Sequence, residues 1–307
     1  MTIARAEMKK GFAALWDSNQ YSLPADMKAA LQRGKDSEGG EVARLHFQIN
    51  LESLAQTSSA RIPLCGDTGL PMYYVVLGER VIDKIDGGLA ALFEELREAV
   101  RRATVSVPMR RNVVDPITRQ EHPDSVGEIV PFIDYRLEPG GRYLEVTAVA
   151  LGGGPELTCQ ARILGAVEGV RGIKRFVIES VARTDAGTNC NPQVVGVGIG
   201  GTMDVASAFA KQAAILRPIG SRHPQVAIAA LEEELTQTLN SLELGPWGLG
   251  GKTTVFDVHI EIAETHIATL PVSLYMQCPA LRRATMRFYD DGRVEDGVEN
   301  SWFRRTT

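Results

Sequence analysis

The chain has 307 residues, 44% hydrophobic and 23% charged, which is typical of a globular protein and too apolar for a disordered one. Its formal net charge of −5 leaves no basic excess to neutralise phosphates, which argues against a nucleic-acid-binding protein. The polar start MTIARAEMKK has no apolar core, so we expect no secretory signal, no membrane span and a cytoplasmic protein.

The N-terminal third has the periodicity of helices. Residues 39–58 place Val42, Leu45 and Ile49 at helical intervals. Residues 86–106 predict a clearer amphipathic helix, whose apolar face carries Leu89, Leu92, Phe93, Leu96 and Val100. Between these two helices, PMYYVVLGE predicts a strand that leaves the turn PLCGDTGLP.

The middle of the chain begins with a polar, irregular segment over residues 105–140, rich in prolines and turn signals. YLEVTAVAL then predicts a strand that runs into LGGGPEL, for which a flexible loop is one interpretation. KRFVIESVA is compatible with the end of a helix or with a strand.

The last third alternates between strands and helices. QVVGVGIGG predicts a strand that leads into the helix MDVASAFAKQAAIL, and a further helix follows over residues 226–244 with Gly245 as its C-terminal cap. TVFDVHIEIAE alternates strictly and predicts a half-buried strand, with His259 on its polar face as a solvated or structurally satisfied histidine. LPVSLYMQC and ATMRFYDDGR add two strands.

This mixture predicts an α/β (mixed α+β) fold, with helices packed on mixed sheets. We expect one large domain over residues 1–307, or two tightly joined lobes.

The glycines of GVGIGG match the dinucleotide-binding pattern G-x-G-x-x-G between a strand and a helix. That pattern also needs an acidic residue about 20 positions further on to bind a ribose hydroxyl. After Asp204 the next acidic residue is Glu232, so this partner is missing. We therefore favour glycines that permit close backbone packing, and keep a nicotinamide-dependent oxidoreductase as an alternative.

The four cysteines are too far apart for a CxxC zinc motif. Cys65, Cys190 and Cys278 each lie at a loop or strand end beside glycine, proline or polar residues, whereas Cys159 begins an amphipathic stretch and is expected to pack. Three such thiols near Asp67 are compatible with an iron–sulfur cluster, for which cysteine thiolates are the usual ligands. Ordinary packing, or zinc with a fourth ligand, remains an alternative.

Three further segments could bind an anion. LGGGPEL could bring backbone N–H groups close to a carboxylate or phosphate. RPIGSRHP places Arg217, Arg222 and His223 before a helix, as a basic helix-entry loop or as a carboxylate site. VPMRRNV offers Arg110 and Arg111, either of which could hold a carboxylate with two hydrogen bonds.

Taken in order, CGDTG, the triple glycine, NCNPQVVGVGIGGTMDVA, ILRPIGSRHP, LGPWGLGGKTTVFDVHIE and CPALRRAT resemble one family. The chain is similar to the alpha subunit, or N-terminal catalytic domain, of class I iron–sulfur fumarate hydratases and L(+)-tartrate dehydratases. The resemblance covers residues 40–288 and leaves 289–307 as a polar tail. It implies a hydro-lyase that reversibly dehydrates a small 2-hydroxy dicarboxylic acid.

The resemblance also implies a set of site residues. Three cysteines, Cys65, Cys190 and Cys278, would hold a 4Fe-4S cluster whose open iron binds substrate as a Lewis acid. Asp67 would exchange a proton with the leaving or entering hydroxyl. The residues implied in substrate binding are Gly66, Arg110, Gly153, Gly154 and His223. Of the two neighbouring arginines, Arg110 fits the family pattern R-x-N, since Asn112 follows it.

The sequence departs from the family pattern in two places. Gly66 stands where the family has a glutamine that touches substrate, and TNCNPQ replaces a proline-rich pattern around Cys190. Both changes border the implied active site. The loss of the glutamine amide opens room and removes a donor, which favours a bulkier or differently substituted substrate than fumarate.

Relatives take further substrate-binding residues from a second module, so we expect a beta subunit as partner, in an α2β2 complex. A non-catalytic metal-binding partner subunit is the remaining alternative.

Overall fold

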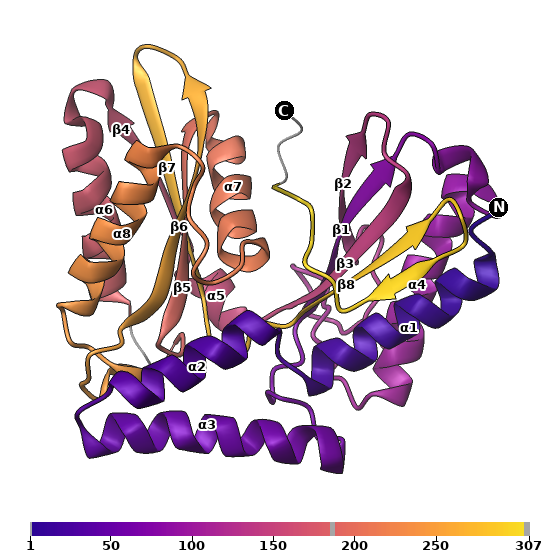
Figure 1. Cartoon of the computed structure of the whole chain (residues 1–307), viewed down its shortest axis with the longest axis horizontal. Helices are drawn as coiled ribbons and strands as arrows, with labels where there is room; N and C mark the ends of the chain where they lie inside the picture. The colour runs from indigo at the N-terminus through magenta and orange to yellow at the C-terminus, as the bar shows by residue number, and fades with distance from the viewer. Residues whose placement is uncertain (1, 185–187, 304–307) are drawn as a thin grey trace. The chain divides into compact units, whose positions relative to one another are not determined.

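The computed structural model describes residues 2–184 and 188–303 (Figure 1). The chain divides into two compact units. The first unit comprises Met1–Pro24, Leu54–Gly152 and Arg282–Thr307, and the second comprises Ala25–Ser53 and Gly153–Leu281. Helix α3 (Glu41–Ala60) contributes residues to both.

The elements of the first unit are α1 (Arg5–Tyr21), β1 (Leu70–Gly78), η1 (Ile82–Lys84), α4 (Gly88–Ser106), β2 (Phe132–Glu138), β3 (Tyr143–Leu151), β8 (Arg283–Tyr289) and β9 (Val294–Asp296). Its described strands form a mixed sheet in the order β2-β1-β3-β8-β9. β1 pairs parallel with β2 and antiparallel with β3. Helices α1 and α4 pack together on this sheet, with Phe12, Trp16, Leu92 and Val100 in its core. β1 is buried along nearly its whole length, which explains its apolar run YYVV.

The segment that follows β9 packs on the first unit's sheet. Arg136 donates to the carbonyl of Ser301 at 3.0 Å, and the rings of Tyr74 and Trp302 lie 5.0 Å apart. Glu145 accepts the backbone N–H of Ser301 at 2.7 Å. The end of the described chain is therefore bound by both polar and aromatic contacts.

The elements of the second unit are α2 (Ala25–Ser37), α5 (Gly153–Thr158), β4 (Gln160–Gly165), η2 (Ala166–Glu168), α6 (Gly169–Arg183), β5 (Gln193–Gly201), α7 (Met203–Leu216), α8 (Val226–Asn240), η3 (Pro246–Gly248), β6 (Val255–Thr265) and β7 (Thr269–Gln277). The described strands form a sheet in the order β4-β7-β5-β6. Helix α7 lies on one side of this sheet, and α6 and α8 lie on the other (Figure 1).

The glycines of GVGIGG permit the close approach of α7 to β5. A Cβ atom on Gly196 would lie 2.0 Å from the carbonyl oxygen of Ala210, and one on Gly198 would lie 1.9 Å from that of Ala206. Side chains at either position would force the helix away from the sheet. The packing interpretation of these glycines is confirmed.

Most of the predicted elements are confirmed, and β2 and α5 show where the prediction was incomplete. β2 lies inside the segment 105–140 that was predicted to be irregular, and helix α5 stands where a flexible loop was one interpretation of the residues after β3. The predicted helix after residue 226 ends at Asn240 with Ser241 as its cap, so Gly245 is not its C-cap. Gly245 instead has φ +65° immediately before η3. KRFVIESVA lies in helix α6.

Burial corrects two further predictions. Cys159 is exposed rather than packed, and its thiol lies 3.1 Å from the carbonyl oxygen of Glu156. The alternation in β6 predicted a half-buried strand, but its polar residues Asp257, His259 and Glu261 are all buried. No helix in the described ranges is long and apolar enough to cross a membrane.

Candidate active site

The turn that carries Cys65 connects α3 to β1 in the first unit. Its backbone is held by Gln20 of α1: the Gln20 carbonyl accepts the N–H of Leu64 at 2.9 Å, and the Gln20 amide donates to the carbonyl of Thr68 at 3.0 Å. Gly69 has φ +89°, and a Cβ there would lie 2.7 Å from the backbone carbon of Ala150. Only glycine therefore allows the turn to enter β1 at this place.

Asp67 is fixed by three groups of the first unit, two of which come from distant parts of its chain. Its Oδ1 accepts the side-chain amide of Asn112 at 2.8 Å and the backbone N–H of Gly69 at 2.9 Å. Its backbone carbonyl accepts Nη1 of Arg282 at 2.6 Å, and Arg282 itself is only 1% exposed. Two donors on one carboxylate oxygen and one on the backbone give Asp67 a defined orientation.

The backbone of Arg110 is hydrogen-bonded to the turn that carries Cys65. The N–H of Arg110 donates to Oγ1 of Thr68 at 2.7 Å, and Arg110 is exposed. Gly66 is also exposed, and a Cβ on it would meet nothing within 4 Å. The structure thus brings together Cys65, Gly66, Asp67 and Arg110, with open space beside Gly66.

In the second unit, the backbone before Cys190 packs against α5. A Cβ on Gly154 would lie 2.8 Å from the carbonyl oxygen of Thr188. The amide of Asn189 donates to Oγ1 of Thr158 at 2.9 Å and to the carbonyl of Met276 at 2.8 Å. These contacts place Asn189, the neighbour of Cys190, beside both helix α5 and the end of β7.

Cys278 directly follows β7. The side-chain amide of the buried Gln277 lies 3.6 Å from its sulfur and donates to its backbone carbonyl at 3.0 Å. Gln277 therefore places an amide donor next to the sulfur of Cys278.

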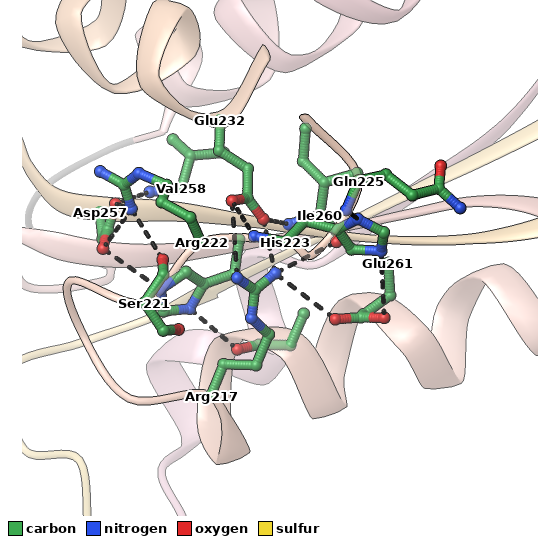
Figure 2. A network of polar contacts seen from close by, with 12 residues as sticks. Arg217, Ser221, Arg222, His223, Gln225, Glu232, Asp257, Val258, Ile260 and Glu261 are labelled. Atoms are coloured by element: carbon green, nitrogen blue, oxygen red, sulfur yellow. Dashed lines mark hydrogen bonds and ion pairs between the residues drawn. The ribbon is translucent and has the colours of Figure 1, made fainter. Parts of the chain in front are cut away.

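His223 lies in the loop between α7 and α8 and has a buried ring. Its Nδ1 accepts the backbone N–H of Gln225 at 3.1 Å, and its Nε2 lies 4.0 Å from Oε2 of Glu261. Its own backbone N–H donates to Glu232 at 2.9 Å. Figure 2 shows this residue inside a network of buried charged groups.

The network explains why the polar face of β6 is buried. Arg217 pairs with Glu232 at 2.5 Å and with Glu261 at 3.4 Å (Figure 2). Asp257 accepts from Arg222 at 2.8 Å, and Nε2 of His259 lies 3.2 Å from it. Each buried charge therefore has an opposite charge or a donor beside it, as burial requires.

The pKa of Asp257 shows the balance of these effects. Burial raises the pKa of a carboxyl, but the hydrogen bond and charge of His259, the N–H of Gly220 and the charge of Arg222 lower it. The result is a pKa below the ordinary value for aspartate. His259 is a structurally satisfied histidine, because its Nδ1 also lies 3.1 Å from the carbonyl of Ala213.

Cys65, Cys190 and Cys278 are not in disulfides, and all three are partly buried. Cys65 belongs to the first unit, and the other two belong to the second. Within the described ranges, no group of three or more histidine, cysteine or acidic side chains is arranged to hold a metal ion. The donor chemistry nevertheless suits an iron–sulfur cluster: the thiols are not paired in disulfides, and Cys278 has an amide donor at its sulfur.

Sequence reasoning missed Arg282 and Glu232 as supports of the candidate residues, and it noted Asn112 only as a spacing mark for Arg110. The carboxylate of Asp67 accepts from Asn112, and its carbonyl from Arg282. The spacing R-x-N was a signal for Asn112. Arg282 lies in the motif CPALRRAT, but it is separated from Asp67 by 215 positions, so nothing in the sequence linked the two residues.

Comparison with known proteins defines the class first. The profile of the fumarate hydratase (Fumerase) family matches residues 10–287, which makes the chain part of a hydro-lyase. A Methanocaldococcus jannaschii protein provisionally named L(+)-tartrate dehydratase subunit alpha is 40% identical over 89% of this chain and 94% of its own length. L(+)-tartrate dehydratase subunit alpha from Escherichia coli (strains UTI89 and K12) is 35% and 34% identical over 89% of this chain and 88% of its own length.

The chain belongs to the fumarate hydratase (Fumerase) family. The resemblance seen in the sequence motifs is confirmed, and the match begins 30 positions earlier than they suggested, at residue 10 rather than 40.

Proposed function

We propose that this chain is the alpha subunit of a 4Fe-4S hydro-lyase that reversibly dehydrates a small 2-hydroxy dicarboxylic acid. The observation that carries the proposal is the turn at Cys65, where a candidate cluster ligand lies two residues from a carboxylate held by Asn112 and Gly69. The match to tartrate dehydratase alpha subunits over 89% of the chain supports it.

In this proposal Asp67 is the proton-transfer residue for the hydroxyl group. A general acid or base acts well only when its oxygen is held within hydrogen-bond reach of the reacting group. The donors from Asn112 and Gly69 to Oδ1 and from Arg282 to the backbone carbonyl limit the rotation of this carboxylate. Asp67 is thereby pre-organised to exchange a proton with a hydroxyl presented to it.

Cys65, Cys190 and Cys278 are proposed as the three ligands of the cluster. When bound, the cluster supplies an open iron that acts as a Lewis acid on the leaving hydroxyl. These three cysteines are partly buried, whereas Cys159 is exposed on a different segment with its thiol against the carbonyl oxygen of Glu156. We therefore propose no ligand role for Cys159.

The substrate carboxylates are proposed to bind Arg110, the backbone amides of Gly153 and Gly154, and His223. The exposed Arg110 is held at its backbone by Thr68, which leaves its guanidinium available to a carboxylate in the two-pronged geometry that arginine favours. Gly66 offers space instead of an amide donor. L-tartrate, malate or a substituted relative is the proposed substrate class.

We propose a beta-type subunit as the partner, in an α2β2 complex. The matched relatives are named as alpha subunits, which is the support for a partner chain. Alone, the chain is expected to bind the cluster and to turn over poorly.

The test is anaerobic reconstitution with iron and sulfide, followed by visible absorption and EPR spectroscopy of wild type, Cys190→Ala and the matched control Cys159→Ala. We expect a brown wild type and control, and loss of the cluster in Cys190→Ala. Dehydration of L-tartrate and malate is then measured after adding a beta subunit. A colourless wild type without iron, or a cluster that survives Cys190→Ala, would contradict the proposal; bound zinc would leave the protein colourless.

A further inference from the structure

Two of the proposed cluster ligands lie at the same end of the second unit's sheet. Strands β5 and β7 pair antiparallel, and Val194, near the start of β5, pairs with Gln277, the last residue of β7. Cys278 follows Gln277 directly, and Cys190 lies shortly before β5. Because the end of one antiparallel strand lies beside the start of its neighbour, this pairing brings both cysteine-bearing segments together.

Asn189 links these two segments by a further contact. Its side-chain amide donates to the carbonyl oxygen of Met276 at 2.8 Å, and only 1% of Asn189 is exposed. The hydrogen bond joins the residue before Cys190 to the strand end that leads into Cys278. The backbone before Cys278 is therefore held both by the pairing of β7 with β5 and by Asn189.

The side chain of Gln277 folds back on the residue that follows it. Its Nε2 donates to the carbonyl oxygen of Cys278 at 3.0 Å and lies 3.6 Å from the sulfur of the same residue. A glutamine amide has two N–H groups, so one of them can serve each acceptor. Sulfur is larger than oxygen, and hydrogen bonds to it are correspondingly longer. Only 3% of Gln277 is exposed, so little water can compete for either N–H group.

The hydrogen bond to the backbone explains only half of this arrangement. The carbonyl oxygen of Cys278 takes one N–H group, and the second is left for the sulfur. Hydrogen bonds to the cysteine sulfurs are among the factors that set the reduction potential of an iron–sulfur cluster. An N–H group beside the sulfur stabilises the more negative, reduced state, and its effect is larger in a buried site of low dielectric constant.

We propose that Gln277 raises the reduction potential of the cluster through an N–H···S hydrogen bond to Cys278. A higher potential slows the oxidation in which dioxygen takes one electron from the cluster and becomes superoxide. The inference rests on the proposed function, in which Cys278 is a cluster ligand. It goes beyond that function because Gln277 neither binds iron nor touches the substrate, and acts only through the sulfur of its neighbour.

The test compares the full-length wild type with Gln277→Met, in which a side chain of similar length has no N–H donor. Gln212→Met is the matched control, because Gln212 is a buried glutamine of α7 in the same unit. Each chain is reconstituted anaerobically with iron and sulfide, and its reduction potential is measured by a redox titration followed by EPR. For Gln277→Met we expect the equilibrium constant for one-electron reduction to fall about tenfold, which lowers the potential by about 59 mV. Its visible absorption should fade faster in air, and the control should match wild type in both measurements.

An unchanged potential in Gln277→Met at equal iron content would overturn the inference. An equal fall in the control would overturn it too, because the loss of any buried amide would then have the same effect. If Gln277→Met takes up no cluster, Gln277→Glu is the second variant. It keeps the length of the side chain, replaces the donor by an acceptor and should also lower the potential; an unchanged potential would again overturn the inference. A wild type that forms no cluster would instead overturn the proposed function itself.

Discussion

Replacing Asn112 by alanine tests the orientation of Asp67 directly. The change removes the amide that donates to Asp67 Oδ1 at 2.8 Å and leaves the backbone N–H of Gly69 at 2.9 Å. A hydrogen bond to a charged group contributes about 1.5–3 kcal/mol. If that energy orients the proton-transfer group, its loss lowers kcat by roughly 10- to 150-fold. KM should change little, because Asn112 holds the carboxylate and not the substrate.

The assay is the initial rate of formation of the unsaturated acid by the cluster-loaded complex, followed by ultraviolet absorption. Gln120→Ala is the control, because this exposed side chain lies in the same irregular segment as Asn112. The visible spectrum of each variant must show the same cluster content, so that a loss of iron is not mistaken for a loss of catalysis. A kcat for Asn112→Ala within about twofold of wild type, at equal cluster content, would refute the role of this hydrogen bond.

Three further predictions follow from the described contacts. Gly198→Ala should lower the free energy of unfolding, measured in urea, by about 1–3 kcal/mol, because its Cβ would lie 1.9 Å from the carbonyl oxygen of Ala206. A Cβ on Gly40 meets nothing within 4 Å, so the control Gly40→Ala should leave the free energy of unfolding unchanged. Because the pKa of Asp257 is lowered, its charge stabilises the fold above pH 3.8, and this stability is lost as the pH falls below 3.8. The difference in unfolding free energy between wild type and Asp257→Asn should therefore shrink below pH 3.8. A difference that stays constant with pH would contradict this prediction. Gly66→Gln has open space for its side chain and should improve kcat/KM for malate relative to bulkier hydroxy acids; an unchanged ratio would show that this position does not select the substrate.

The packing of β5 on α7 could be predicted because its cause is local. Gly196 and Gly198 alternate along one strand, and the helix that follows presents alanines, including Ala206 and Ala210. Small residues on both sides of a contact allow backbones to approach, and both halves of the contact are visible within 20 residues. The same pattern lacked the acidic partner of a nucleotide site, so the packing interpretation could be chosen from the sequence.

The burial of β6 could not be predicted from its alternating apolar and polar residues. Such a pattern shows that a strand has two different faces, but it does not show what packs on each face. Asp257, His259 and Glu261 gave the pattern of a half-exposed strand. Arg217, the partner of Glu261, lies 44 positions away from it, and Arg222, the partner of Asp257, lies 35 positions away, both in the segment between α7 and α8. Charged residues on a strand therefore predict exposure only when no opposite charges are folded against them.

The sequence predicted which residues form the candidate site, but it did not predict the contacts that hold them in place. The motifs identified Cys65, Asp67 and Arg110, which the first unit does bring together. Helix α1 holds the turn through Gln20, and the segment after β7 holds it through Arg282, contacts that depend on the tertiary fold alone.

Two candidate residues share the same kind of support, although they belong to different units. The backbone carbonyl of Asp67 accepts from the buried Arg282, and the backbone N–H of His223 donates to the buried Glu232. In both cases a buried charged side chain binds the main chain of a loop that carries a proposed functional residue. Loops without such anchors would lose conformational entropy each time a substrate bound. Substitutions at Arg282 and Glu232 should therefore weaken catalysis or binding, although neither side chain is proposed to touch the substrate.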